Sequence, residues 1–335
     1  MVGIDDVARR AGVSTATVSR ALSGRGHVSA DAKARVEEAA ASLGYVVSAV
    51  ASSLASGRAR NIGVLVPYVQ RWFFSTVLSG TAAELVRHGY DTTLYSLAED
   101  AGLRRSVFDT FLRRRRVDGV IAVSIELADD EIDRLTALGL PVIALGGPDP
   151  RLSALTLDDV AVARLATEHL LALGHTRIAH IGAGSEFDRD FHIPTRRRQG
   201  FEQALTAAGL DVHRALFEPA DFTIEGGFRA ATRLLGGEGE EPTAIFAASD
   251  EMAIGALLAA RELGRRVPAD LSVVGVDGHE LGGFFQLTTV DQFPARQGRR
   301  AATAILAALE EHRSPEPGAL PFELVIRGTS GPPAR

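Results

Sequence analysis

The chain carries the stretch Ile4-Asp5-Asp6-Val7-Ala8-Arg9-Arg10-Ala11-Gly12-Val13-Ser14-Thr15-Ala16-Thr17-Val18-Ser19-Arg20-Ala21-Leu22, which predicts two short helices separated by a glycine. Val7, Ala8 and Ala11 recur at helical spacing. Gly12 can adopt the positive φ that a tight turn needs, and the Ser14 hydroxyl can cap the helix that follows. The pattern therefore predicts a helix-turn-helix.

The outer face of the second predicted helix carries groups that suit contact with duplex DNA. Arg20 can form two hydrogen bonds to the O6 and N7 atoms of a guanine, and the methyl groups of Thr15 and Ala16 can contact a thymine methyl. The same region offers hydroxyl groups that can donate to phosphate oxygens, at Ser14, Thr17 and Ser19. An ordinary helical hairpin with solvated polar residues is the alternative, and the short pattern alone leaves both interpretations open.

A third helix is expected over residues 30–43, with Ser29 as its cap and Gly44 at its end. Val36, Ala40 and Leu43 lie on one side of this helix, so it can close a three-helix headpiece over residues 1–45. The rest of the expected core is Val7, Val18, Leu22 and Tyr45.

The motifs of this region closely resemble the headpiece of the LacI/GalR family of bacterial transcription repressors. The matching runs are Asp6-Val7-Ala8, Ala11-Gly12-Val13-Ser14, Thr17-Val18-Ser19-Arg20, His27-Val28-Ser29 and Gly44-Tyr45. The resemblance implies a homodimer that holds two headpieces over a pseudo-palindromic DNA operator and responds to a small-molecule effector bound by a larger domain. It also implies that His27 contacts a phosphate.

Residues 46–60 correspond to the family's hinge helix and linker, and here the sequence departs from the family pattern. The usual Tyr-x-Pro-Asn motif is replaced by Tyr45-Val46-Val47-Ser48, although Ser48 can still cap a short helix. The resemblance assigns Leu54 as the leucine that the family inserts between base steps of the minor groove, and Ala51 lies on the same apolar stripe. A solvated linker is the alternative.

Composition is consistent with a globular DNA-binding protein of more than one domain. The chain has 335 residues, of which 46% are hydrophobic, and no cysteine. It has no apolar run of about 18 residues and no signal-peptide pattern, so we expect a cytoplasmic protein without membrane contact. The net charge is −6, yet residues 1–60 carry eight Lys and Arg against five Asp and Glu, which places basic charge on the headpiece.

From residue 61 the pattern changes to short apolar runs that alternate with helical stretches, which is typical of doubly wound, mostly parallel sheets. Strands are expected at 62–66, 91–95, 119–123, 141–145, 177–181, 243–247, 271–276 and 322–326. Helices are expected near 77–87, 103–115, 129–138, 160–173, 195–208, 225–235 and 250–263.

The resemblance implies that this α/β part has the fold of the type I periplasmic sugar-binding proteins, with two parallel-sheet subdomains. The N-subdomain, residues 61–158 and 291–319, would carry the dimer contact. The C-subdomain would comprise residues 159–290 and 320–330. An effector is expected in the cleft beyond the carboxyl ends of the strands.

Several residues match effector-binding positions of the family. Phe73 and Phe74, in an expected loop after the first strand, could cover one face of a ligand, with core packing as the alternative. Arg197 matches an arginine that binds hydroxyl or carboxylate groups, and an exposed helix-face charge is its alternative. Phe222 matches an aromatic residue that stacks on sugar rings. Asp277, at the end of an apolar strand, matches an aspartate that accepts hydrogen bonds from effectors.

Three further residues are candidates for the cleft on weaker grounds. Asp250 opens a predicted helix, where a carboxylate is also a good cap. Ser124 and Asp158 are candidates of the same kind. The implied effector is a sugar or sugar phosphate, although purine-responsive relatives use the same positions.

No pattern for catalysis, a cofactor or a metal stands out. The sequence has no His-x-x-x-His pair, Gly-x-Ser-x-Gly elbow or Walker loop, and Gly182-Ala183-Gly184 lacks the third glycine of a dinucleotide fingerprint. His175 and His180 are expected to be structural. We therefore expect a transcriptional regulator that is not an enzyme and needs no cofactor. A cytoplasmic carbohydrate-binding protein without a DNA role and an enzyme with an accessory helix-turn-helix are the alternatives.

Overall fold

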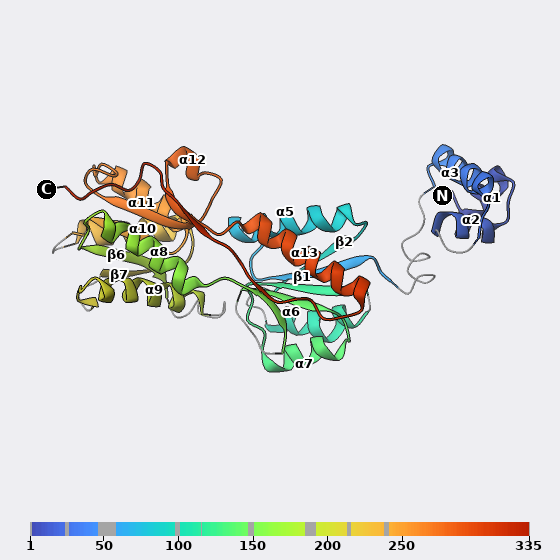
Figure 1. Cartoon of the computed structure of the whole chain (residues 1–335), viewed down its shortest axis with the longest axis horizontal. Helices are drawn as coiled ribbons and strands as arrows, with labels where there is room; N and C mark the ends of the chain where they lie inside the picture. Colours follow the sequence, from blue (N-terminus) through green and yellow to red (C-terminus); the bar gives the residue numbers. More distant parts are fainter. Residues whose placement is uncertain are drawn as a thin grey trace. The chain divides into compact units, whose positions relative to one another are not determined.

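The computed structural model describes residues 2–23, 27–45, 58–97, 101–114, 116–146, 151–184, 192–212, 216–237 and 241–334. Two compact units make up the chain. The three helices of residues 1–60 belong to the smaller unit, and residues 61–114 with 118–335 form the larger one (Figure 1). Each unit is described by itself.

The smaller unit contains the three expected helices, α1 (Ile4–Ala11), α2 (Thr15–Ser23) and α3 (Ala30–Leu43). Gly12 ends α1 with a φ of 65°, and the Ser14 hydroxyl accepts a hydrogen bond from the Thr17 N–H at 3.2 Å at the start of α2. Val7, Val18 and Val36 are fully buried at the centre of the bundle. Leu22 and Tyr45 pack at its edge, so the predicted headpiece core is confirmed.

The larger unit contains two six-stranded sheets. The first has the strand order β11-β5-β4-β3-β1-β2, and all its pairs are parallel. Its strands are β1 (Asn61–Val66), β2 (Asp91–Ser96), β3 (Gly119–Val123), β4 (Val142–Gly146), β5 (Ser153–Thr156) and β11 (Gly318–Ala319). Its helices are α5 (Trp72–Arg87), α6 (Ala101–Ser106), α7 (Asp129–Ala137) and α13 (Pro294–Glu311).

The second sheet has the order β12-β10-β9-β8-β6-β7 and is parallel except for the β10–β12 pair. Its strands are β6 (Ile178–Ala183), β7 (Leu216–Ala220), β8 (Ala244–Ala247), β9 (Ser272–Asp277), β10 (Thr288–Asp291) and β12 (Glu323–Val325). Its helices are α8 (Asp159–Ala172), α9 (Ile193–Ala207), α10 (Ile224–Gly236), α11 (Asp250–Glu262) and the short α12 (Gly282–Phe285).

Helices cover both faces of each sheet. In the first subdomain, α5 packs against α13 on one side of the sheet, and α6 and α7 lie on the other (Figure 1). In the second, α8 packs against α9 and α10 packs against α11. The chain changes sheets three times: between β5 and β6, between β10 and β11, and between β11 and β12. The expected fold class, an α/β chain with two parallel-sheet subdomains and a helical headpiece, is confirmed.

Two local predictions are wrong. Residues 72–74, expected in a loop, form the first turn of α5. The helix expected near 103–115 is broken: α6 is followed by a π-helical turn (Val107–Phe111) and a 3₁₀ turn (Leu112–Arg114). Among the described residues, no helix has both the length and the apolar character needed to cross a bilayer.

Candidate functional site

The exposed face of α2 is the one that the sequence predicted. Val18 is fully buried, whereas Thr15, Ala16, Ser19 and Arg20 are exposed. The Arg20 Nε–H donates to the Ala16 carbonyl at 3.1 Å, which holds the base of the guanidinium close to the helix. This short, polar helix surface has the shape and chemistry that major-groove contact requires.

Of the other residues predicted to contact DNA, some lie at the start of α2 or beside it, and two lie outside the described residues. Ser14 caps α2, and its hydroxyl lies 2.9 Å from the Thr17 hydroxyl, so both oxygens stand at the helix start. His27 is exposed between α2 and α3. Ala51 and Leu54, predicted to belong to the hinge, lie outside the described residues.

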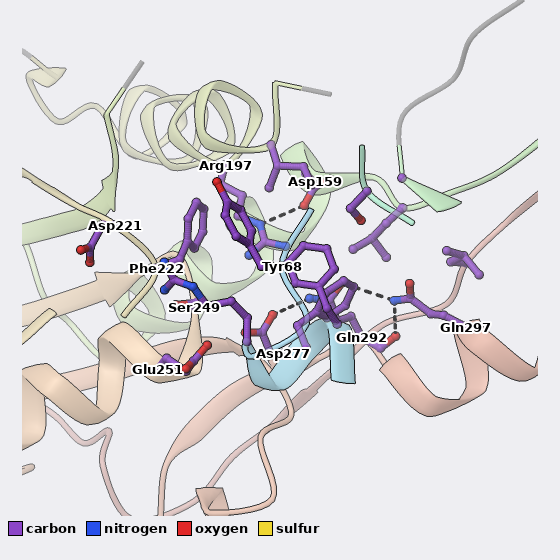
Figure 2. Close-up of a pocket in the computed structure, with 18 residues that line it drawn as sticks. Tyr68, Asp159, Arg197, Asp221, Phe222, Ser249, Glu251, Asp277, Gln292 and Gln297 are labelled. Atoms are coloured by element: carbon purple, nitrogen blue, oxygen red, sulfur yellow. Dashed lines mark hydrogen bonds and ion pairs between the residues drawn. The ribbon is translucent and has the colours of Figure 1, made fainter. Parts of the chain in front are cut away.

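A cavity lies between the two sheets of the larger unit and includes about 850 Å³ of space not filled by atoms, counting its open mouth. The elements of both subdomains contribute to its walls. Six residues predicted for the effector cleft line this cavity: Phe73, Phe74, Ser124, Arg197, Phe222 and Asp277. Figure 2 shows how the polar residues gather around it.

Three of these lining residues have an unusual backbone conformation. Ser124 follows β3 with a φ of 41°, Phe222 follows β7 with a φ of 57°, and Asp277 ends β9 with a φ of 133°. Positive φ is costly for side-chain-bearing residues, and it persists where the surrounding structure enforces it, often at ligand sites. All three stand at the carboxyl ends of parallel strands, where α/β folds bind ligands.

A buried ion pair forms one side of the cavity. The Arg197 Nε–H, from α9, donates to the Asp159 carboxylate of α8 at 2.9 Å, and Arg197 Nη1 donates to the Ala248 carbonyl. Burial raises the pKa of Asp159, while the positive charge of Arg197 opposes that rise. The pair fixes the guanidinium at the cavity wall, where it can donate to a ligand oxygen.

Asp277 is the second anchored polar group. The Gln292 Nε2–H donates to its Oδ1 at 2.5 Å, and Gln297 Nε2 donates to the Gln292 carbonyl at 2.8 Å, which makes the chain of hydrogen bonds drawn in Figure 2. Burial raises the pKa of Asp277 well above its ordinary value. A ligand hydroxyl or amine would therefore meet an acceptor whose position is already fixed.

Asp250 and Asp158 do not line the cavity. Asp250 is fully buried, accepts a hydrogen bond from the backbone N–H of His279 at 2.7 Å, and has its pKa raised by burial to about 6. Asp158 is exposed and caps α8 by accepting the Ala161 N–H at 3.0 Å. Asp158 is therefore a helix cap, whereas Ser249, and not Asp250, supplies the side-chain cap of α11. The neighbouring Asp159 is the carboxylate that reaches the cavity.

The sequence reasoning missed several lining residues. Tyr68 and Arg71 precede α5, and the Arg71 guanidinium lies 5.6 Å from the centre of the Tyr68 ring. Further polar side chains missed are Asp159, Asp221, Ser249, Glu251, Gln292 and Gln297. Gln292 could have been predicted from its position, because it follows β10 at the carboxyl end of a strand that pairs with β9.

The aromatic side chains at the start of α5 pack together. The rings of Phe73 and Phe74 are 5.3 Å apart and nearly perpendicular, and Tyr68 lies 6.2 Å from Phe74. Phe74 is nearly buried and Phe73 is partly exposed, so core packing and cavity lining are combined in this pair. Among the described residues, no cluster of His, Asp and Glu side chains could hold a metal ion.

This chain combines a headpiece that has an exposed helix-turn-helix face with a polar and aromatic cavity between two mostly parallel sheets. Together these features define the class of ligand-responsive DNA-binding regulators. Residues 3–48 match the family of bacterial regulatory proteins of the lacI family, and residues 167–330 match a periplasmic binding protein-like domain. The HTH-type transcriptional repressor PurR of Mannheimia succiniciproducens is 34% identical over 306 residues, which cover 90% of this chain and 90% of that repressor.

Solved structures agree with this assignment. The lac repressor dimer bound to operator and the anti-inducer ONPF is 29% identical, covers 98% of this chain and 99% of that one, and has a TM-score of 0.85. The complex of the transcriptional regulator CelR with cellobiose is 28% identical, covers 98% of this chain and 100% of that one, and has a TM-score of 0.72. This chain belongs to the lacI family of bacterial regulatory proteins.

Proposed function

We propose that this protein is a transcriptional repressor that binds a pseudo-palindromic operator as a homodimer and is controlled by a sugar or sugar derivative bound in the cavity. The observation that carries the proposal is the cavity itself. It combines a fixed arginine, Arg197, a fixed acceptor, Asp277, and the partly exposed aromatic Phe222. Hydroxyl groups suit the polar pair, and the faces of sugar rings suit an aromatic side chain.

The dimer is proposed to form through the N-subdomain. Two apolar side chains of that subdomain support this choice: Val86 on α5 is 68% exposed and Leu94 on β2 is 42% exposed. Two headpieces held together bind a two-fold operator much more tightly than one, because the second contact is then intramolecular.

Control by the effector is proposed to be a population shift. One arrangement of the two subdomains would favour operator binding, and an effector that prefers the other arrangement would lower operator affinity by the ratio of its affinities for the two. The bound operator would weaken effector binding by the same factor. The proposed site of action is the bacterial cytoplasm, where operator DNA is found.

The test uses the full-length protein. Thermal shift against a panel of sugars, sugar phosphates and purines identifies ligands, and mobility-shift titration against inverted-repeat duplexes from the neighbourhood of its own gene identifies the operator. We expect specific operator binding that a panel hit changes. Binding of a sugar without preference for any inverted repeat would instead favour the carbohydrate-binding protein without a DNA role.

A further inference from the structure

The start of α5 forms one wall of the cavity. Arg71 precedes the helix, and Arg71, Phe73 and Phe74 all line the cavity. These residues belong to the subdomain of the first sheet. Their positions therefore depend on what holds the first turn of α5 against the second subdomain.

Glu251, which also lines the cavity, lies near the backbone of this turn. It belongs to the first turn of α11, in the second subdomain (Figure 2). Burial raises the pKa of the Glu251 carboxyl, and both the positive charge of Arg71 and the nearby backbone N–H of Trp72 oppose that rise, which places the carboxylate close to the start of α5. A carboxylate at a helix N-terminus satisfies a backbone N–H that has no partner within the helix, and it interacts favourably with the helix dipole.

His279 holds the side chain of Trp72, the first residue of this turn. Its ring stacks on the Trp72 ring, with the centroids 4.4 Å apart and the planes 28° from parallel. His279 is itself fixed at two points, because its N–H donates to Asp250 at 2.7 Å and its Nδ1 accepts the Leu281 N–H at 3.0 Å. Asp250 thus supports the backbone of the histidine whose ring contacts Trp72.

Arg71, which precedes α5, carries a buried donor that a ligand could use. Its Nη1 is buried and has no hydrogen-bond partner within the described part of the chain. A buried donor without a partner costs free energy, which an acceptor atom of a ligand would recover. Displacing the first turn of α5 would move this donor together with the two phenylalanines.

We propose that Glu251 and His279 are positioning residues of the effector cavity: from the second subdomain they hold Trp72, and thereby fix the wall formed by Arg71, Phe73 and Phe74. The role of this wall in effector binding rests on the proposed function of the cavity. The contacts of Trp72 with Glu251 and His279 are independent of that function, because they join residues of this chain alone.

The experiment uses Trp72, the only tryptophan in the sequence, as its own reporter. Emission wavelength and acrylamide quenching are measured on the full-length protein without ligand, with far-UV circular dichroism to verify folding. His279→Ala and Glu251→Ala should each shift Trp72 emission to longer wavelength and increase its quenching. His279→Phe, which keeps a ring for stacking, should restore the wild-type signal, and Glu262→Ala, at the exposed end of α11, is the matched control.

Wild-type emission and quenching in both folded alanine variants would overturn the proposal. A red shift that His279→Phe does not reverse would overturn the stacking contact. If His279→Ala does not fold, Glu251→Gln, which keeps the shape of the side chain and removes its charge, takes its place and should increase quenching. Since no operator or effector is present, failure here would leave the proposed function intact, and failure of operator binding would leave the fluorescence result intact.

Discussion

Arg197 and Asp159 form an ion pair in which both side chains are almost completely buried, with the Arg197 Nε 2.9 Å from the Asp159 Oδ1 and exposed fractions of 5% and 6%. The two residues come from neighbouring helices of one subdomain, α9 and α8, which pack against each other. A buried ion pair contributes little net stability, but removing one partner leaves an uncompensated charge in a low dielectric.

The consecutive residues Asp158 and Asp159 provide a matched comparison. Asp159→Asn should lower the free energy of unfolding by about 3–5 kcal/mol, because the Arg197 charge then lacks its counterion. Asp158→Asn should change it by less than about 0.5 kcal/mol, since asparagine caps helices as well as aspartate does. Urea unfolding of both full-length variants measures the difference, and equal effects would show that the burial of Asp159 is not maintained in solution.

Asp277 should be required for the effector response and not for operator binding. In Asp277→Ala, the cavity loses its anchored acceptor, while α2 keeps its exposed face. We expect operator affinity without effector to stay at the wild-type value, and the change caused by a panel hit to disappear. Mobility-shift titrations with and without that hit measure both quantities, and a normal response in Asp277→Ala would contradict the assignment of the cavity.

Arg20 should determine the preference for one base pair of the operator. Arg20→Ala should reduce discrimination at that position by about 1–3 kcal/mol, because a two-bond contact to guanine is lost. Competition between the operator and duplexes with single substitutions gives the number. Arg35→Ala, an exposed arginine on α3, is the control and should weaken binding to all these duplexes alike or leave it unchanged.

His180 should make the fold sensitive to acid. Its Nδ1–H donates to the Phe246 carbonyl at 3.1 Å, its Nε2 is buried without a partner in the described structure, and burial lowers its pKa to about 4. Because the pKa is lower in the folded state than in the unfolded one, the contribution of neutral His180 is complete above pH 6.5 and is lost as the pH falls toward 4. The loss should reach about 2 kcal/mol at pH 5.

The variant His180→Phe isolates this effect. The rings of Phe201, Phe217 and Phe246 contact the imidazole, so a phenylalanine at position 180 would have aromatic neighbours and no group that titrates. Urea unfolding at pH 7.5 and pH 5 should show that the variant loses about 2 kcal/mol less than the wild type between these values. The exposed His312→Gln should keep the wild-type dependence, and an unchanged slope in His180→Phe would assign the acid sensitivity to another group.

Two glycines allow the close contact between α5 and α13. A Cβ at Gly80 would lie 2.0 Å from the Ala295 carbonyl oxygen, and one at Gly298 would lie 2.0 Å from the Val77 carbonyl oxygen. Gly80→Ala should therefore lower the free energy of unfolding by about 1–3 kcal/mol. Gly236→Ala, where a Cβ meets nothing within 4 Å, should be neutral or stabilising by up to about 1 kcal/mol. Thermal or urea unfolding compares the two.

The sequence predicted some site residues and missed others for physical reasons. Arg197 and Asp277 were found through the family resemblance, and the structure places both at the cavity. Asp158 was chosen in place of Asp159 because helix periodicity does not reveal which of two adjacent carboxylates faces a neighbouring helix. The start of α5 was assigned to a loop because Trp72-Phe73-Phe74 corresponds to a loop of the family it resembles. No capping side chain marks the helix start, since the structure has none at Arg71.

By itself, the sequence determined the helix-turn-helix, most of the strands and the division into a helical and an α/β part, because caps, glycines and apolar periodicity act between residues close in the chain. It missed the short strands β5, β7, β10 and β11, which the sheets complete by pairing with distant segments. Only the tertiary structure decided which side chains meet across the cavity. Trp72 with His279, and Arg197 with Asp159, are distant in sequence, and their contact depends on how whole subdomains and helices pack. Local sequence patterns do not predict that packing, because contacts between side chains far apart in the sequence depend on the final arrangement of all the elements.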